Sequence, residues 1–141
     1  MIDKFENYLT QGKAKKKTQD IVEANSLLER AKKRMQYIRP LNNDTAFLIL
    51  EDSYESAREA AQAMMSKEGF KPYSHEATIS FLKDFYINEF SEYELSQFDR
   101  FRELRNNALY KGKPINEEDA SKCLKFAKCI IKKVEIMLSK K

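Results

Sequence analysis

The sequence predicts an all-α protein, an up-and-down bundle of about five helices. Glycine and proline occur only three times each in 141 residues while 34% are charged, so long stretches lack the residues that form tight turns between strands. Within these stretches, apolar residues recur every three or four positions, which is the period of one helix face. A chain of this length can bury its own core, and we expect a single domain over residues 1–141.

The first half of the chain predicts a short helix within residues 1–12, ending near Gly12, and then two long helices. Capping residues and helix-ending residues set the limits of the long helices. These limits are Thr18 or Asp20 and Pro40 for the first, and Asn42, Asn43 or Asp44 and Gly69 for the second. The two apolar faces are Ile21, Ala24, Leu28, Ala31, Met35 and Ile38, and Phe47, Leu50, Tyr54, Ala57, Ala61, Met64 and Met65.

The second half predicts a turn at residues 69–72, a short helix capped by Ser74, and two further helices. Residues 91–94 have the form of a capping box, and the helix that they open is expected to end at Gly112. Asn116 and the acids after it predict the start of the last helix. Its apolar face is Ala120, Cys123, Leu124, Ala127, Ile130, Ile131, Val134, Met137 and Leu138.

The sequence lacks the motifs that are typical of several classes of enzyme. It contains no phosphate-binding glycine loop, Rossmann fingerprint or paired-cysteine motif, so classical enzyme classes are not expected. Cys123 and Cys129 are predicted to be small core fillers, and His75, the only histidine, is expected to have a local structural role. We therefore expect no metal and no cofactor. The chain has no long apolar run, which predicts a soluble, cytoplasmic protein without a membrane contact.

The net charge of +4 is concentrated in two basic runs. They are Lys13, Lys15, Lys16 and Lys17, followed by Lys32, Lys33 and Arg34. Such a run is usually a solvated face, but it is also what a nucleic-acid phosphate backbone attracts. Few aromatic residues lie between these charges, so base stacking at this edge is not expected.

Arg105 stands out because it falls in the middle of an apolar helix face, with Arg102 at the margin. A guanidinium stays protonated, and burying it without a partner is costly. Two interpretations stay open: Arg105 snorkels or forms an internal ion pair, or it meets an anionic ligand. Among the acids of the second long helix, Glu51 is the better predicted partner, because Asp52 and Glu55 lie further from the apolar stripe.

The segment Arg105–Tyr110, followed by a glycine turn and a capped last helix, resembles the HEPN (higher eukaryotes and prokaryotes nucleotide-binding) domain. The pattern Tyr54-x-x-Ala57-Arg58-x-x-Ala61 and the run from Gly69 through His75 to Leu82 resemble the preceding part of small prokaryotic members. The likeness spans about residues 20–138.

This resemblance implies a homodimer in which one cleft is lined, from both protomers, by a motif of an arginine, four to six intervening residues and a histidine. Many such proteins are metal-independent endoribonucleases, often toxins paired with a minimal nucleotidyltransferase antitoxin, and others are inactive nucleotide-binding or scaffolding versions. By position, Arg105 matches the motif arginine and Asn106 the polar residue that follows it. Tyr110 stands in the histidine position, which departs from the pattern.

The departure matters because RNA cleavage through the 2′-hydroxyl needs a base and an acid. Tyrosine titrates near pH 10 and is a poor base at neutral pH, whereas arginine and asparagine can still hold a phosphate. Tyr110 is therefore either a weak catalytic group, an acceptor of a nucleotidyl group, or an aromatic side chain that closes the helix end against the core. His75 is an alternative base from another helix.

We accordingly expect an HEPN-like protein that binds RNA or nucleotide phosphate through Arg102, Arg105 and Asn106 at a dimer cleft. Arg105 and Tyr110 are the candidate catalytic residues, with Glu51 and His75 in support. The partner expected is a minimal nucleotidyltransferase in a two-gene, toxin–antitoxin type system, with weak or impaired catalysis here. The alternatives are an active metal-independent endoribonuclease and a structural bundle without ligand.

Overall fold

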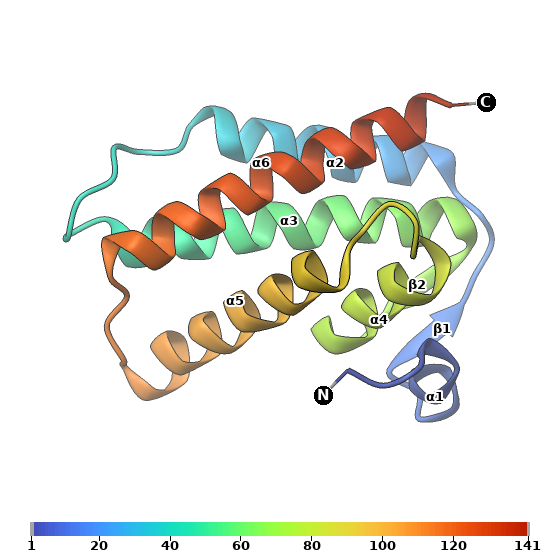
Figure 1. Ribbon diagram of the computed structural model, residues 1–141. Helices are drawn as coiled ribbons and strands as arrows, with labels where there is room; N and C mark the ends of the chain where they lie inside the picture. The colour runs from blue at the N-terminus through green and yellow to red at the C-terminus, as the bar shows by residue number, and fades with distance from the viewer. Residues whose placement is uncertain (1, 141) are drawn as a thin grey trace.

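The computed structural model describes residues 2–140, and this part of the chain contains six helices and two short strands (Figure 1). In chain order the elements are α1 (Phe5–Thr10), β1 (Ala14–Lys16), α2 (Ile21–Gln36), α3 (Ala46–Glu68), β2 (Phe70–Pro72), α4 (His75–Phe85), α5 (Glu92–Lys111) and α6 (Glu117–Ser139). The predicted all-α bundle is confirmed.

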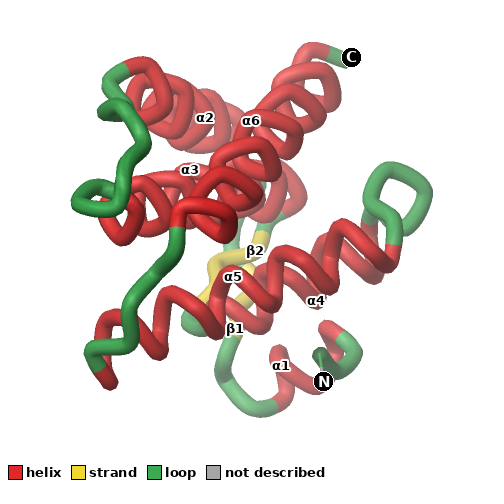
Figure 2. Tube along the Cα trace, turned by 60° about the vertical axis from the view of Figure 1, so that its left-hand side comes forward, coloured by secondary structure: helices red, strands yellow, loops and turns green. Residues whose placement is uncertain are grey.

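Helix α3 is the central element. It makes its most extensive contacts with α2 and α6, which lie on one side of it, while α4 and α5 lie on the other side (Figure 1, Figure 2). The sequence predicts one apolar face for this helix, but its buried residues lie all around it, as expected for a helix enclosed by neighbours. Most of them are alanine, serine and other small residues, which let the surrounding helices approach closely.

The predicted helix ends are largely confirmed. In four helices the capping side chain accepts a hydrogen bond from a backbone N–H of the first turn, and the caps are Asp20, Ser74, Ser91 and Asn116. The capping box of residues 91–94 has both of its hydrogen bonds. Gly69 and Gly112 end α3 and α5 in the left-handed conformation, with φ of 93° and 66°.

Three boundaries differ from the prediction. Helix α2 ends at Gln36, before Pro40, so Ile38 of its predicted apolar face lies outside the helix; a proline disfavours the helical conformation of the residue before it. Helix α3 starts after Thr45, because the Asn42 side chain accepts hydrogen bonds from the backbone of Asp44 and Thr45 and so forms a turn before the helix. Residues 69–72 form more than a turn: Phe70–Pro72 is strand β2, and it pairs antiparallel with β1. The pairing joins segments more than 50 residues apart, which no local pattern reveals.

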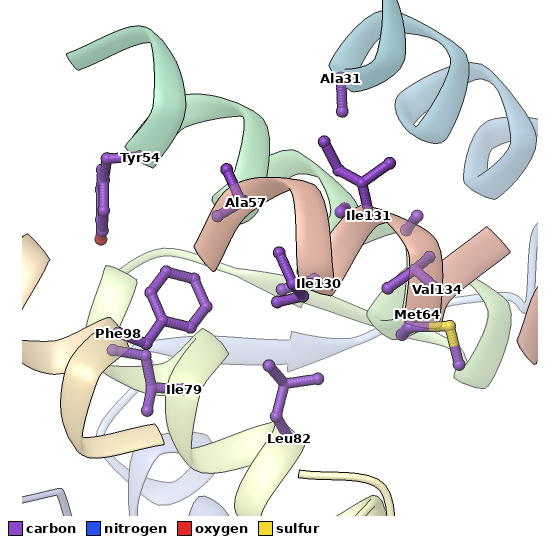
Figure 3. Packing of buried hydrophobic residues seen from close by; sticks show 14 of the residues in the cluster. Ala31, Tyr54, Ala57, Met64, Ile79, Leu82, Phe98, Ile130, Ile131 and Val134 are labelled. Carbon is purple, nitrogen blue, oxygen red and sulfur yellow. The ribbon is translucent and has the colours of Figure 1, made fainter. Parts of the chain in front are cut away.

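The core continues from the helices to the N-terminal segment. The aromatic rings of Phe5, Phe70, Phe81 and Phe85 pack together with centroids 4.5–5.9 Å apart. Figure 3 shows the aliphatic part, where Ile130, Ile131 and Val134 of α6 lie among residues of α2, α3 and α4.

The cysteines fulfil only half of the prediction. Cys123 is buried and packs in the core, whereas Cys129 is exposed, so its assignment as a core filler is wrong. Cys123 lies on the buried apolar face of α6, and Cys129 lies on its solvent-exposed face. Within residues 2–140, none of the helices has both the length and the apolar character needed to cross a bilayer.

Candidate functional site

Six ionisable side chains from three helices meet on one side of α3, and we call them the arginine cluster. Helix α3 contributes three of them, the first turn of α4 one, and α5 two. The members are Tyr54, Glu55, Arg58, His75, Arg102 and Arg105.

Arg105 lies at the centre of the cluster, and its side chain is only 17% exposed. Its Nη2 is 3.7 Å from Glu55 Oε1, and its guanidinium carbon lies 5.9 Å from the centre of the Tyr54 ring. Its Nε–H is buried and has no hydrogen-bond partner among the described residues. An unpartnered buried donor on a charged group is costly, so Arg105 is only partly satisfied within the protomer.

The side-chain hydrogen bonds of Glu55 go to Arg58, and none goes to Arg105. Arg58 Nη2 donates to Oε2 at 2.7 Å and Arg58 Nε to Oε1 at 3.3 Å, which is a two-pronged guanidinium–carboxylate pair. Burial alone would raise the pKa of Glu55, but the hydrogen bonds and charge of Arg58 and the charge of Arg105 outweigh it and lower the pKa. Glu55 is therefore ionised at neutral pH.

The acid that meets Arg105 is Glu55, so the prediction of Glu51 as its partner is wrong. The two acids lie four residues apart on α3, which is one helical turn or about 5.4 Å along the axis. Which turn faces Arg105 depends on how α3 and α5 are placed along each other. The sequence alone does not fix that placement.

His75 joins the cluster through Tyr54, whose hydroxyl lies 3.0 Å from His75 Nδ1. Figure 3 shows Tyr54 at one margin of the apolar core, on the side of Phe98. Burial raises the pKa of Tyr54 and lowers that of His75, and the charge of Arg58 lowers the His75 pKa further. Both groups are therefore neutral at pH 7.

The direction of this hydrogen bond depends on the tautomer of His75. When Tyr54 donates to Nδ1, the only acceptor of its hydroxyl among the described residues, the imidazole proton is on Nε2. In this form His75 offers an N–H donor and not a free lone pair. That suits the binding of an anion better than the removal of a proton.

The remaining predicted residues lie along α5. Arg102, with its side chain 16% exposed, donates through Nε to Asp99 at 2.7 Å and lies 3.7 Å from Glu103. Asn106 is half-buried and has no side-chain hydrogen bond within residues 2–140. Tyr110 is 75% exposed, so the interpretation that it closes the helix end against the core is wrong.

The charges of the cluster favour an anion. Three guanidinium groups lie beside two closely held carboxylates, those of Glu55 and Asp99; Glu103 is mostly exposed to solvent, and the charge of Glu76 also acts on Arg102. Guanidinium groups bind the oxygens of phosphate in the same forked geometry as those of carboxylate. The cluster can therefore hold a phosphate group through donors that the protein leaves unused.

A sequence model described as the HEPN domain matches residues 24–137, which is most of the chain. The chain belongs to the HEPN domain family. HEPN domains are in general related to nucleotides and RNA. A search of curated protein sequences found no match. The HEPN match contains the whole arginine cluster, but α1 and β1 precede it.

Sequence reasoning missed three members of the cluster in this HEPN protein as site residues. They are Tyr54, Glu55 and Arg58. The sequence contains a pattern that points to them. Tyr54 and Arg58 lie four residues apart and therefore on one face of the helix, and a tyrosine ring commonly packs against an arginine guanidinium. The tyrosine was assigned to the core, which it does reach, but its hydroxyl ends at the cluster.

Proposed function

We propose that this HEPN protein binds a phosphate group of an RNA or a nucleotide at the arginine cluster. Arg105 is the main contact, Arg102 and Asn106 assist on the same helix, and His75 donates a hydrogen bond from Nε2. Phosphate oxygens would accept hydrogen bonds from the terminal Nη groups of Arg105, whose side chain makes no hydrogen bond within the described residues.

The observation that carries this proposal is the state of Arg105. Its side chain is mostly removed from water, yet its carboxylate partner is already held by Arg58 at shorter distances. A structural ion pair would be expected to have matched charges and complete hydrogen bonds. An arginine held ready for an incoming anion has the arrangement seen here.

We further propose that the ligand binds at an interface between two copies of the chain. Leu109 and Tyr110 are exposed at the end of α5, a few residues beyond Arg105, and they give this end an apolar and aromatic surface. A second copy covering this surface would bring more groups to the phosphate and exclude water from it. A homodimer is thus part of the proposal.

The proposed role is one component of a two-gene system with a minimal nucleotidyltransferase, and the cluster is expected to bind better than it cleaves. With Tyr54 donating to its Nδ1, His75 has its proton on Nε2, and Tyr110 is a phenol, so neither is a ready base at neutral pH. An active endoribonuclease is the second candidate, favoured by the presence of an imidazole beside Arg105.

The test compares the wild-type protein with Arg105→Met and with Arg100→Met as a matched control. Arg100 lies on the same helix, but it is more exposed and pairs with Asp119 outside the cluster. Binding of AMP and of a fluorescein-labelled single-stranded RNA is measured by calorimetry and by fluorescence anisotropy. We expect Arg105→Met to weaken both by at least about tenfold while Arg100→Met changes neither.

The same variants separate the alternatives. If Arg105→Met leaves both affinities unchanged, the arginine cluster is not the phosphate site and the proposal is wrong; if the wild-type protein binds neither ligand, the protein is a structural bundle. Incubation with unlabelled RNA then tests catalysis: cleavage that is lost in Arg105→Met supports the endoribonuclease, and its absence supports a binding component. Sedimentation velocity, with Tyr110→Glu as the interface variant, tests the proposed dimer.

A further inference from the structure

A second basic surface lies beside the arginine cluster, formed by the two-stranded ribbon and a cavity next to it. We call it the ribbon face, and it consists of Lys15, Lys71, Tyr73, Arg30 and Gln62. Strand β1, which carries Lys15, precedes the region that the HEPN model matches, whereas the other four residues of the ribbon face lie within that region.

The ribbon brings like charges together. Lys15 and Lys71 are directly opposite each other in the antiparallel pair, which places both side chains on the same face of the ribbon. Both residues are exposed, and neither forms an ion pair with an acid in residues 2–140. Like charges in this position destabilise a strand pair, so the arrangement is explained more readily if an anion binds between them.

The ribbon also places an aromatic ring next to these charges. Tyr73 is 57% exposed, and the ammonium of Lys71 lies 5.7 Å from the centre of its ring. The backbone N–H of Tyr73 donates to the carbonyl of Lys13 at 2.8 Å, which fixes the ring beside the first basic run of the chain. An aromatic ring from a distant segment thus lies beside this basic edge, although few aromatic residues lie between its charges in the sequence.

A cavity of about 460 Å³ continues from the ribbon, and Lys71, Arg30 and Gln62 contribute to its lining. Gln62 accepts a hydrogen bond from Arg58 of the arginine cluster at 3.1 Å. Polar contacts thus run without a break from Arg105 through Glu55, Arg58 and Gln62 to the cavity. These contacts connect the arginine cluster to the cavity beside the ribbon, whose lining also includes Lys17 and Glu23.

We propose that the ribbon face binds the backbone of a single-stranded RNA that extends from the arginine cluster, with Tyr73 stacked on an unpaired base. This inference rests on the proposed function, because it specifies that ligand as a strand and not a mononucleotide. Glu55 and Gln62 are seven residues apart on α3, which is about 10 Å along the helix. One phosphate cannot contact both the arginine cluster and the ribbon face, whereas a strand of several nucleotides can.

The combination of unpaired lysines with an exposed ring favours this ligand over other anions. Lysines alone would bind any polyanion, but a protein that binds single strands pairs such charges with aromatic rings on which bases stack. In a duplex the bases are already stacked on one another, so Tyr73 would gain no contact. An acidic membrane surface is the competing ligand and is included in the test.

The test uses the full chain and a fluorescein-labelled single-stranded RNA of about 12 nucleotides, within the usual range of site sizes. The ribbon variant is Lys15→Glu with Lys71→Glu. Its matched control is Lys125→Glu with Lys128→Glu, two exposed lysines of α6 that form no ion pair within the described residues. Far-UV circular dichroism checks that all variants fold.

We expect the ribbon variant to bind this RNA more weakly and with a shallower salt dependence, while its affinity for AMP is unchanged. Each lost phosphate contact reduces the slope of log affinity against log salt by about 0.7 for a single strand, so two contacts reduce it by about 1.4. Over a fourfold rise in salt this corresponds to about sevenfold less loss of affinity. Tyr73→Ala is expected to weaken RNA binding by roughly fivefold or more, and Tyr73→Phe to preserve it.

Each outcome has a defined meaning. If the ribbon variant behaves like the α6 control with the labelled RNA, the inference is overturned, and the effect of Arg105→Met on AMP decides the proposed function independently. Loss of RNA binding in the ribbon variant, with no effect of Arg105→Met on RNA or AMP, also overturns the inference, because the strand would then not extend from the arginine cluster. Lost binding to vesicles of phosphatidylserine, with RNA binding intact, overturns the inference in favour of a membrane contact.

Discussion

Replacing Arg30 and Arg34 together with alanine should destabilise the protein by about 3–5 kcal/mol, because it leaves the Glu59 carboxylate buried without a partner. Glu59 lies on α3 facing α2, and its side chain is only 2% exposed. Its two oxygens accept hydrogen bonds from Arg30 Nε and Arg34 Nη1.

The two arginines should not contribute equally. The side chain of Arg34 is 29% exposed and that of Arg30 is 65% exposed, so the pair with Arg34 is the better shielded from solvent. We expect about 2 kcal/mol for Arg34→Ala and about 1 kcal/mol or less for Arg30→Ala. Glu59→Met should cost little, because methionine fills the same space and both guanidinium groups can reach water.

Urea unfolding followed by far-UV circular dichroism measures these free energies. The double arginine variant should also melt about 10 °C lower, and adding Glu59→Met to it should restore most of the loss. The reasoning is refuted if Glu59→Met alone is as destabilising as the double arginine variant. In that case the ion pair itself, and not the penalty of an uncompensated carboxylate, would supply the stability.

Three further predictions follow from individual residues. Gly69→Ala should destabilise more than Gly112→Ala in urea unfolding, by more than about 1 kcal/mol, because both have positive φ but only at Gly69 would the new Cβ lie 2.8 Å from a backbone oxygen. Ser56→Ala should raise the free energy of unfolding by about 1 kcal/mol, since the buried hydroxyl has no partner and alanine favours the helix. Stability should fall as the pH drops below about 6.5, because burial and the charge of Arg58 lower the pKa of native His75, so the unfolded chain takes up a proton that the folded chain resists. His75→Gln should remove this part of the pH dependence, and an unchanged slope in that variant would contradict the assignment.

The helices could be predicted because their signals are local. A cap such as Ser91 and a stop such as Gly112 act within one turn of the residues that they bound, and the periodicity of α6 is visible in its own segment. The β1–β2 ribbon has no such signal. Its strands are three residues each, one of them is rich in lysine, and they pair only because α3 and Gly69 return the chain beside β1.

The sequence predicts which helix carries the main residue of the candidate site, but it does not predict which turn of α3 lies opposite that residue. Arg105 was identified from its position on an apolar face, which is a property of one helix. The choice between Glu51 and Glu55, and the approach of His75, depend on how three helices pack. A shift of one turn along α3 exchanges the two acids without changing any local pattern.

The geometry of α5 also bears on how a site with both Arg105 and Tyr110 would have to be built. Five residues advance a helix by about 500°, so the two side chains leave the axis about 140° apart. The structure agrees with this, since the Arg105 side chain is 17% exposed within the arginine cluster while Tyr110 is 75% exposed. One protomer therefore does not present both side chains to the same phosphate. If the Tyr110 phenol acts on a ligand bound to Arg105, that phenol must come from a second copy of the chain. If Tyr110 has another role, it does not need to lie near the arginine cluster.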